Sequence, residues 1–294
     1  MTVPSRSENL ISIMVIYNFR PDISEIIMAL ECGQLRKAIF VDNSTERETG
    51  TEFVKNVIPP SIENKVLFVK NKTNVGLSKG INLGLVEARK LCADYIFILD
   101  QDAILLRGYF EEMYQNFRFV EIRDTKLCLL GPIVSNSPNN MGKSMGFRSS
   151  FSRVKTIINS GMMFSSQTIE RIGIFNEELF IGSIDHEFCR RITEIGGHIY
   201  RLNKVMINQS FGKNVKGTNL FGKAMSLETR FFSYIMLGLN KTNEFQFFTP
   251  FYGAEQARLN LIDAQKFEQN KNPGLIKTII SKIYRRLIEK FGDV

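Results

Sequence analysis

The 294-residue sequence contains no tryptophan and only two histidines, His186 and His198. With so few imidazoles, a metal site built mainly from histidine is excluded. No apolar run approaches the roughly 18 residues that identify a membrane-spanning helix. The first ten residues also lack the apolar stretch of a secretory signal peptide. These absences lead us to expect a cytoplasmic protein.

Cysteine is scarce as well: Cys32, Cys92, Cys128 and Cys189 are widely separated, and none forms a Cys-x-x-Cys pair. This spacing disfavours both structural zinc and a disulfide framework. We therefore predict free, buried thiols in a reducing compartment.

Positive charge is in excess, with 38 lysine and arginine residues against 30 aspartate and glutamate residues, a net charge of +8. Such an excess fits nucleic acid, an anionic membrane surface or a phosphorylated substrate. Outside the C-terminal segment the basic residues are scattered, and the sequence carries no nucleic-acid-binding motif. We therefore predict no nucleic-acid partner.

The first half of the chain alternates short apolar runs with amphipathic stretches. Buried strands are predicted at 11–17, 38–41, 65–69 and 95–99, with helices at 22–32 and 78–91 between them. This order predicts an α/β fold with a parallel sheet. Because ligands of such sheets bind outside the carboxyl ends of the strands, polar residues at those ends are the first candidates for a site.

Beyond residue 131 the pattern is weaker. We predict a loop over 132–150, strands at 156–159 and 162–165, and helices near 167–172 and at 185–195.

The last segment differs in character, because residues 273–291 carry an apolar stripe at helical spacing. Residues 271–294 hold six basic and two acidic side chains, so half of the net charge lies here. A basic amphipathic helix can lie on an anionic membrane. It can equally pack on its own domain or on a second subunit, and the sequence does not decide between these alternatives.

Asp100-Gln101-Asp102 directly follows the predicted strand 95–99. Two carboxylates one residue apart at a strand end can both face Mg²⁺ or Mn²⁺. Surface loops also produce this pattern by chance, so its place after a buried strand is what favours a metal site.

A second candidate runs from Asn71 through Gly76 to Asn82, from a strand end into a helix. The N-terminus of that helix offers N–H groups and a positive dipole end, both suited to phosphate. The spacings of a dinucleotide fingerprint and of a P-loop are both absent. A capped helix after a turn is the alternative.

Asp185 stands at the start of the predicted helix 185–195. A carboxylate at this place is either an N-cap or a general base that takes a proton from a hydroxyl group. Without further context the cap is favoured.

Taken in order, these motifs resemble the family 2 glycosyltransferases, and within them the bacterial rhamnosyltransferase branch. The resemblance extends over about residues 11–212. The motifs that carry it are Asn18, Val41-Asp42-Asn43-Ser44, Asn74-Val75-Gly76 with Asn82, Asp100-Gln101-Asp102, Asn159-Ser160-Gly161, and the run from Asp185 to Arg191.

The resemblance implies a GT-A fold, with a Rossmann-like, mostly parallel central sheet and helices on both faces. The implied glycosyltransferase domain spans 1–225, with a nucleotide-sugar half at about 1–130 and an acceptor half at about 131–225. A C-terminal helical region, 226–294, would follow.

The resemblance also implies roles for individual residues. Asp185 would be the catalytic base of an inverting displacement, and Asp102 together with Asp100 would ligate Mg²⁺ or Mn²⁺. Residues implied to bind the nucleoside-diphosphate sugar are Tyr17, Asn18, Asp42, Asn43, Asn74, Gly76, Asn82 and Asp100, with Ser160 and Gly161 bordering the sugar.

The implied reaction belongs to bacterial surface polysaccharide assembly, such as O-antigen or capsule. Rhamnose would pass from dTDP-rhamnose to an oligosaccharide or lipid-linked acceptor, at or near the inner face of the plasma membrane. A UDP-hexose or UDP-N-acetylhexosamine donor is one alternative. A non-catalytic nucleotide- or glycan-binding relative is the other.

Two positions depart from the family pattern. Gln209 stands where family members usually carry the histidine of a His-x-x-Gly motif, and Ile235-Met236 replaces an Arg-Asn pair of the rhamnosyltransferase branch. Both changes bear on the donor sugar, and the first also bears on metal dependence.

Overall fold

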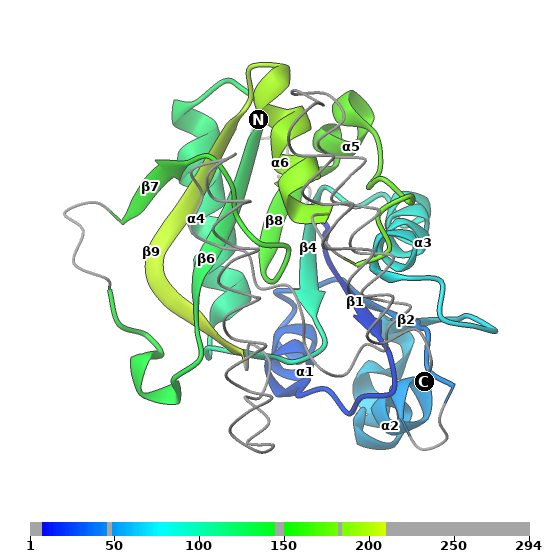
Figure 1. Ribbon diagram of the computed structural model, residues 1–294. Helices are drawn as coiled ribbons and strands as arrows, with labels where there is room; N and C mark the ends of the chain where they lie inside the picture. The colour runs from blue at the N-terminus through cyan, green and yellow to red at the C-terminus, as the bar shows by residue number, and fades with distance from the viewer. Residues whose placement is uncertain (1–7, 46–48, 145–149, 182–183, 210–294) are drawn as a thin grey trace, which may run out of the picture. The chain divides into compact units, whose positions relative to one another are not determined.

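Figure 1 shows the computed structural model, with the described residues in colour. This structure divides the chain into two units, Met1–Ser210 and Phe211–Val294. The residues it describes are 8–45, 49–144, 150–181 and 184–209, all in the first unit. The predicted helical region 226–294, its basic helix 273–291 and the Ile235-Met236 pair lie outside the described residues.

Nine strands of the described part form one mixed sheet in the order β3-β2-β1-β4-β8-β6-β9-β5, with β7 paired to β9. The four N-terminal strands pair in parallel, as predicted. Strand β8 is antiparallel to both of its neighbours, β4 and β6, and β6 pairs in parallel with β9. The strands are β1 Leu10–Ile16, β2 Lys37–Asp42, β3 Val66–Lys70, β4 Tyr95–Asp100, β5 Ala103–Leu105, β6 Cys128–Ser135, β7 Phe151–Val154, β8 Met162–Ser165 and β9 His198–Gln209.

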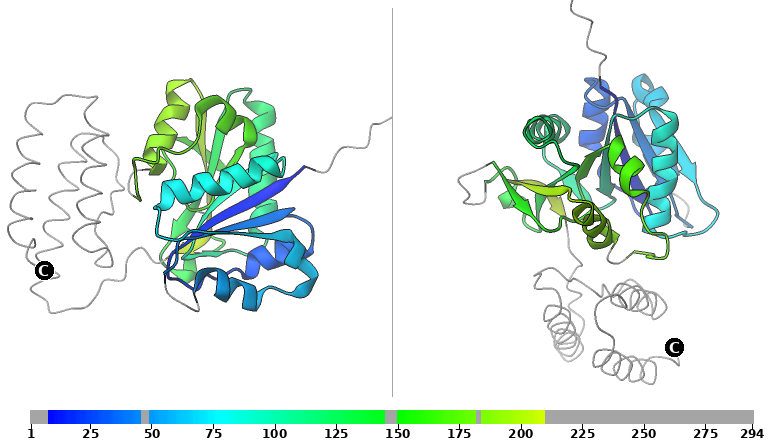
Figure 2. Two further views of the ribbon diagram at one scale, coloured as in Figure 1. Left: turned by 90° about the vertical axis from the view of Figure 1, so that its right-hand side faces the viewer. Right: turned by 90° about the horizontal axis from the view of Figure 1, so that it is seen from above.

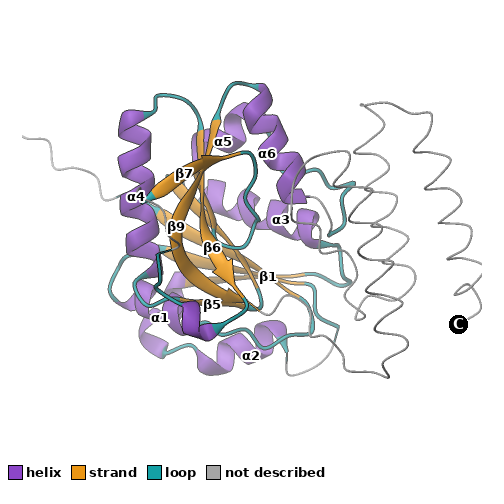
Figure 3. Cartoon of the chain, turned by 60° about the vertical axis from the view of Figure 1, so that its left-hand side comes forward, coloured by secondary structure: helices purple, strands orange, loops and turns teal. Residues whose placement is uncertain are grey.

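Helices cover both faces of this sheet, as the sequence predicts (Figures 2 and 3). One face carries α1 Ser24–Glu31, α2 Gly50–Val57 and α4 Tyr109–Arg123. The other carries α3 Leu77–Lys90, α5 Ser166–Ile172 and α6 Ile184–Glu194. Two short 3₁₀ helices, Pro60–Lys65 and Pro138–Asn140, lie in connections.

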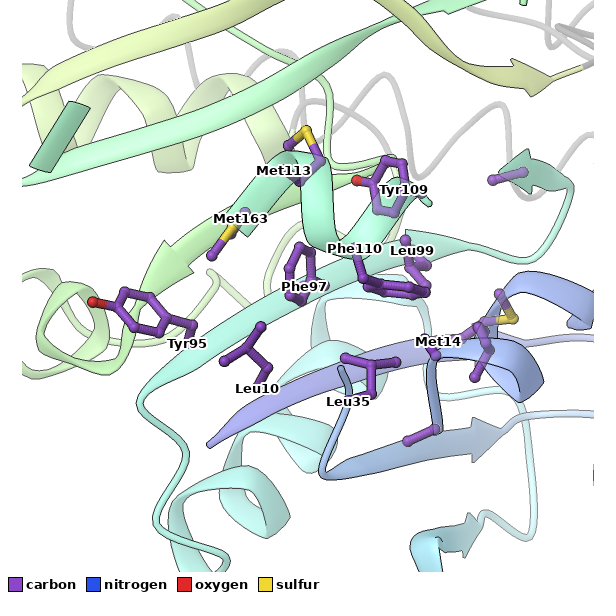
Figure 4. Close-up of a cluster of buried hydrophobic side chains, with 14 of the residues drawn as sticks. Leu10, Met14, Leu35, Tyr95, Phe97, Leu99, Tyr109, Phe110, Met113 and Met163 are labelled. Carbon is purple, nitrogen blue, oxygen red and sulfur yellow. The ribbon is translucent and has the colours of Figure 1, made fainter. Parts of the chain in front are cut away.

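Two cores follow from the alternation of side chains along the strands. In β1, Met14 and Ile16 face the core beneath α1 and α4, whereas Ile13 and Val15 face the core beneath α3 and α6. Figure 4 shows the first core, where the rings of Phe97 and Phe110 meet edge to face with centroids 5.1 Å apart. Both faces of β1 are therefore buried, which explains its continuously apolar sequence.

Helix α3 lies unusually close to β1 because it presents glycine to the strand. A Cβ atom at Gly84 would lie 2.4 Å from Cγ2 of Ile13, and one at Gly80 would lie 2.8 Å from Cγ1 of Val15. Any side chain there would push the helix outward. The two glycines thus fix the N-terminus of α3 beside the carboxyl end of β1.

The second half of the unit corrects several predictions. The predicted loop 132–150 is wrong at its start, because β6 continues to Ser135. The strand accommodates Pro132 at an irregularity, with register shifts between Gly131 and Ile133 and between Ile133 and Val134. The predicted strand 156–159 is not a strand; the strand is β7, a few residues earlier, which pairs with β9. Helices α2 and α4 and strand β9 have no counterpart among the predicted elements.

The cysteine prediction holds in part. All four thiols are free, and Cys128 and Cys189 are buried. Cys32 and Cys92 are exposed, because each follows the end of a helix, and Cys92 takes a left-handed φ of +54° there. Among the described helices, none has both the length and the apolar character needed to cross a membrane.

Candidate functional site

The order of the sheet reverses between β1 and β4. From β1 the chain proceeds to β2 and β3 on one side, and then returns to place β4 on the other side. Ligands of α/β sheets bind at such a switch point. Here Gln101 joins the two strand ends, because its Oε1 accepts a hydrogen bond from the backbone N–H of Tyr17 at 2.7 Å.

Asp42, at the end of β2, is fully buried. Its oxygens accept hydrogen bonds from the backbone N–H groups of Ser44 (2.8 Å) and Thr51 (2.9 Å) and from Nζ of Lys70 (2.7 Å). Burial alone would raise the pKa of this carboxyl, but Lys70, Ser44 and Thr51 outweigh burial and lower it. The ionised carboxylate therefore joins Ser44, Thr51 and Lys70 to the end of β2.

Asn18 and Asn43 cross-link the neighbouring strand ends. Asn18 has a left-handed φ of +46°, and its backbone N–H donates to Oγ of Ser44 at 2.9 Å. Asn43 is buried; its Nδ2 donates to the Gly76 carbonyl at 3.2 Å, and its Oδ1 accepts from Asn71 at 2.8 Å. Tyr17, by contrast, is 36% exposed and free to meet a ligand.

The N-terminus of α3 holds a distant segment of the chain. Asn82 brackets Phe175, accepting its backbone N–H at 2.9 Å and donating to its carbonyl at 2.8 Å. The Leu77 N–H donates to the Phe180 carbonyl at 2.6 Å, so this end of α3 is not fully open to phosphate. Gly76 has a φ of +87°, and a Cβ there would lie 2.7 Å from the Phe180 ring. Asn74 supports the turn by accepting the Gly76 N–H at 3.0 Å.

The segment bracketed by Asn82 leads into α6, which carries Asp185. The Phe175 ring stacks on Phe188 of that helix, with centroids 4.1 Å apart and an interplanar angle of 10°. Through Asn82 and this stack, α6 is joined to α3 in the N-terminal half of the unit.

Asp100 and Asp102 lie close to the end of β9. Strand β5, directly after Asp102, pairs antiparallel with β9 and sets Ala103 opposite Gln209. As a result, Nε2 of Gln209 donates to Oδ2 of Asp100 at 3.0 Å and to Oδ1 of Asp102 at 2.7 Å. Nδ2 of Asn159 donates to the other oxygen of Asp100 at 2.5 Å.

The pKa of Asp100 is raised to about 7. Burial is the largest cause, the charge of Asp102 is the next, and the charge of Asp185 adds to it, while Gln209 and Asn159 oppose the shift. Burial also raises the pKa of Asp102, against the hydrogen bonds from its own backbone N–H and from Gln209. The charges of Asp102 and Asp185 therefore both act on Asp100.

Asp185 is the second residue of α6 rather than the residue before the helix, so it is not the N-cap. Its Oδ1 lies 2.8 Å from the backbone N–H of His186 and 2.9 Å from Nδ1 of the same residue. Both hydrogen bonds recorded in the described part of the chain involve Oδ1, which leaves Oδ2 for another partner.

Ser160 and Gly161 lie packed beneath the strand ends. Ser160 is fully buried, and its Oγ has no hydrogen-bond partner among the described residues. Gly161 has a φ of +80°, and its carbonyl accepts from the Tyr109 hydroxyl at 2.7 Å. A Cβ there would lie 2.5 Å from Cδ1 of Ile207. Their predicted place beside a sugar stays a prediction.

The side chains beside Asp100 and Asp102 offer oxygen donors that suit a hard divalent cation. Among the described residues, no three His, Cys, Asp or Glu side chains are grouped so as to hold a metal ion. The carboxylates of Asp100 and Asp102 are joined by the amide of Gln209, whose Oε1 is buried and lacks a hydrogen-bond partner within the described ranges. Carboxylate and amide oxygens are the ligands that Mg²⁺ and Mn²⁺ prefer.

Several of the contacts described above were not predicted from the sequence. Gln101 and His186 each stand next to a predicted site residue, and that adjacency was the available signal. Asn159 belonged to a quoted motif but had no assigned partner. Lys70 gave no signal, because only the folded sheet brings it to Asp42.

Known proteins resemble this chain in sequence and in fold. A dTDP-rhamnosyl transferase of Shigella flexneri, RfbF, is 25% identical over 153 residues, which cover 49% of this chain and 52% of that protein. The structure of GalNAc-T7 with UDP, GalNAc and Mn²⁺ matches with a TM-score of 0.55 at 11% identity, covering 69% of this chain and 44% of that one. TarS 1-349 of S. aureus with UDP matches with a TM-score of 0.49 at 18% identity, covering 70% and 61%.

These similarities support different conclusions about the chain. The chain spans about half the length of the curated relative. The likeness to GalNAc-T7 shows the fold, that of GT-A glycosyltransferases, as predicted. Residues 12–163, just over half of the sequence, match Glycosyl transferase family 2, and the chain therefore belongs to that family.

Proposed function

We propose that this protein is an inverting glycosyltransferase that moves a sugar from a nucleoside-diphosphate donor to a hydroxyl group of a glycan. The observation that carries the proposal is the pair Asp100 and Asp102, joined by Gln209 at the end of β4 beside the switch point of a family 2 chain. The charge of Asp185 acts on the same pair by raising the pKa of Asp100. One carboxylate pair suits the diphosphate side of the reaction, and a separate carboxylate at a helix N-terminus suits proton removal.

In this proposal the donor nucleotide lies along the ends of β1, β2 and β4. The exposed ring of Tyr17 offers it an apolar face. Asp42 contributes indirectly, by holding Ser44, Thr51 and Lys70 in place, since its oxygens already accept hydrogen bonds from all three. The other residues assigned to the donor are Asn18, Asn43, Asn74, Gly76, Asn82, Ser160 and Gly161.

Asp185 is the proposed base. As the acceptor oxygen attacks the anomeric carbon, Oδ2 of Asp185 takes the hydroxyl proton, and the bond from carbon to the diphosphate breaks with its electron pair. His186 keeps Oδ1 engaged at 2.9 Å, which orients the carboxylate. Asp100 and Asp102, with Gln209, would hold Mg²⁺ or Mn²⁺, which supplies positive charge against the departing diphosphate.

For the donor we propose dTDP-rhamnose, and for the acceptor an oligosaccharide or lipid-linked glycan of bacterial surface polysaccharide. The rhamnosyl donor is supported by the likeness to the dTDP-rhamnosyl transferase of Shigella flexneri. A UDP-hexose or UDP-N-acetylhexosamine is the alternative donor within the same reaction.

Asp185→Asn should abolish transfer while leaving nucleotide binding intact, because the amide keeps the shape of the side chain but cannot accept the proton. A positioned general base contributes roughly 10²–10⁴-fold to a rate. We therefore expect turnover to fall by at least about 10²-fold, measured as nucleoside diphosphate released with acceptor present, at an unchanged Kd for dTDP. Glu63→Gln, an exposed carboxylate outside the site, is the matched control. Turnover of Asp185→Asn within a few-fold of wild type would remove Asp185 from the mechanism.

A thermal-shift panel of nucleotide sugars with Mn²⁺ tests the donor. A ligand that binds the folded state but not the unfolded state raises the unfolding temperature. We expect the largest rise with dTDP-rhamnose. A larger rise with a UDP-sugar would reassign the donor. Saturable binding without release of sugar to any acceptor would favour a non-catalytic binding protein instead.

A further inference from the structure

Gln209 occupies the position between two like charges. Its Nε2 donates one hydrogen to Asp100 at 3.0 Å and the other to Asp102 at 2.7 Å. The side chain is only 7% exposed, so water does not substitute for these bonds. Without a cation, the partly positive N–H₂ group is what lies between the two carboxylates.

The other end of the same amide is unsatisfied. Oε1 of Gln209 is buried and accepts no hydrogen bond from any residue that the structure describes. A buried carbonyl oxygen without a partner is uncommon in proteins and points to a missing water or ion. The terminal torsion of glutamine is broad and roughly two-fold, so a half turn exchanges Oε1 with Nε2.

We propose that Gln209 is an exchangeable third ligand of a divalent cation site formed with Asp100 and Asp102. In the cation-free protein its N–H₂ group bridges the carboxylates. With a cation present the amide turns and offers Oε1 instead. This inference rests on the proposed function, which requires a cation at Asp100 and Asp102. It adds Gln209 as a third side-chain ligand of that cation.

Two consequences distinguish this site from one with histidine in the same position. All of its side-chain ligands are oxygen atoms, which favours Mg²⁺ and Mn²⁺ over Zn²⁺. The third ligand is neutral, so the site carries only the charges of the two aspartates. Gln209→His should therefore shift the preference toward Zn²⁺.

The direction in which Gln209→Leu changes the affinity for Mn²⁺ shows whether Gln209 is a ligand or only a bridge between the carboxylates. If Gln209 only bridges the carboxylates, it competes with the cation, and Gln209→Leu should tighten Mn²⁺ binding. If Gln209 is a ligand, Gln209→Leu should weaken Mn²⁺ binding by about tenfold or more. The measurement is the free Mn²⁺ signal in electron paramagnetic resonance, on the full chain with saturating dTDP. Gln115→Leu, on the exposed face of α4, is the matched control.

A second variant keeps the test decisive should Gln209→Leu fail to fold. Gln209→Glu has the same shape, retains the oxygen and loses the donor. We expect its cation-free form to unfold at a lower temperature than wild type and to regain that loss with Mn²⁺. An unchanged unfolding temperature without cation would overturn the bridging role.

The amide itself can be observed. In ¹H–¹⁵N spectra, the side-chain N–H₂ signals of Gln209 are identified as the pair that the Gln209→Glu variant lacks. In the wild-type protein this pair should shift when Mg²⁺ and dTDP are added. A pair that does not move, tighter Mn²⁺ binding by Gln209→Leu, or no saturable Mn²⁺ binding by wild type would each overturn the inference. The proposed transfer reaction is judged separately by Asp185→Asn, so the two can fail independently.

Discussion

Asp42 accepts hydrogen bonds from Ser44, Thr51 and Lys70, and so joins the end of β2 to the loop before α2 and to the end of β3. Such a carboxylate stabilises the fold only while it is ionised. Its pKa is lowered, because Lys70 and the N–H groups outweigh the effect of burial. A lowered pKa means that the contribution is present above the ordinary aspartate range and is lost as the pH falls through the folded value.

Asp42→Asn should therefore lower the free energy of unfolding most at neutral pH. Loss of a charged hydrogen-bond acceptor of this kind costs about 1–3 kcal/mol. The gap between wild type and variant should narrow as the pH falls below about 4, the ordinary pKa of aspartate, because the wild-type carboxyl is then being protonated. Urea denaturation from pH 7 to pH 3 measures the gap, with Glu63→Gln as control. A gap that stays constant over this range would contradict the assignment.

At this scale the sequence predicts where polar residues stand but not which partners they have. Asp42, Asp100 and Asp102 were predicted to lie at strand ends, and they do. The contacts of Asp42 with Lys70 and of Asp100 with Gln209 join residues 28 and 109 positions apart. No local pattern encodes such a pairing; only the register of the sheet creates it.

Among the elements, α3 and β1 are the best example of a contact that residue size controls. Gly80 and Gly84 allow the helix to lie against Val15 and Ile13. The same helix carries Asn82, which makes two hydrogen bonds to the backbone of Phe175. The position of α3 on the sheet therefore also sets the position of Phe175.

Gly84→Ala should destabilise the unit although alanine is the better helix former. Overpacking costs about 1–3 kcal/mol, whereas the gain in helix propensity is at most about 1 kcal/mol. Ile13→Leu removes the Cγ2 atom that lies 2.4 Å from the added Cβ, so the double variant should recover part of the loss. A double-mutant cycle by urea denaturation measures this coupling. Strictly additive effects would mean that the helix simply moves away.

Elements with a clear period were predicted and elements without one were missed. The four parallel strands are continuously apolar and buried on both faces, so their pattern is unambiguous. Strand β9 mixes Arg201, Asn203 and Lys204 with apolar residues, and its pairing with β5, β6 and β7 comes from the fold. Residues 156–159 look like a strand, yet β7 pairs with β9 instead.

For the whole molecule, charge divides between the two units in a way that composition alone cannot show. Half of the net charge of +8 lies in residues 271–294, beyond the described part of the chain. In the first unit, the charges of Asp102 and Asp185 raise the pKa of Asp100, and the proposed diphosphate ligand would require a cation there. The basic segment is therefore a separate question from the site.

The sequence leaves three alternatives for this basic segment: an anionic membrane, its own domain, or a second copy of the chain. We propose removal of its charge as the test of the membrane. Each basic residue near an anionic surface contributes about 1 kcal/mol to binding. In the full chain, replacing four of them by glutamine should reduce co-sedimentation with phosphatidylserine vesicles by tenfold or more: Lys277, Lys282, Arg285 and Arg286.

The matched control removes the same charge from exposed positions of the first unit: Lys72, Lys79, Lys90 and Lys126. Equal losses in both variants would indicate a general charge effect. Unchanged vesicle binding together with a dimer in sedimentation velocity would favour a subunit contact.

Gln209 is the last residue of β9, and its contacts reach back 109 residues to Asp100 and 107 residues to Asp102. During synthesis, therefore, the ribosome completes almost the entire first unit before the residue that joins the two carboxylates exists. Contacts of such long sequence separation form late in folding, because their loop-closure entropy must be offset by structure already made. A nascent chain that stops before residue 209 would already contain β1 to β4 and yet lack the amide that joins Asp100 to Asp102. On the proposed function, the cation site would therefore be among the last parts of the first unit to form.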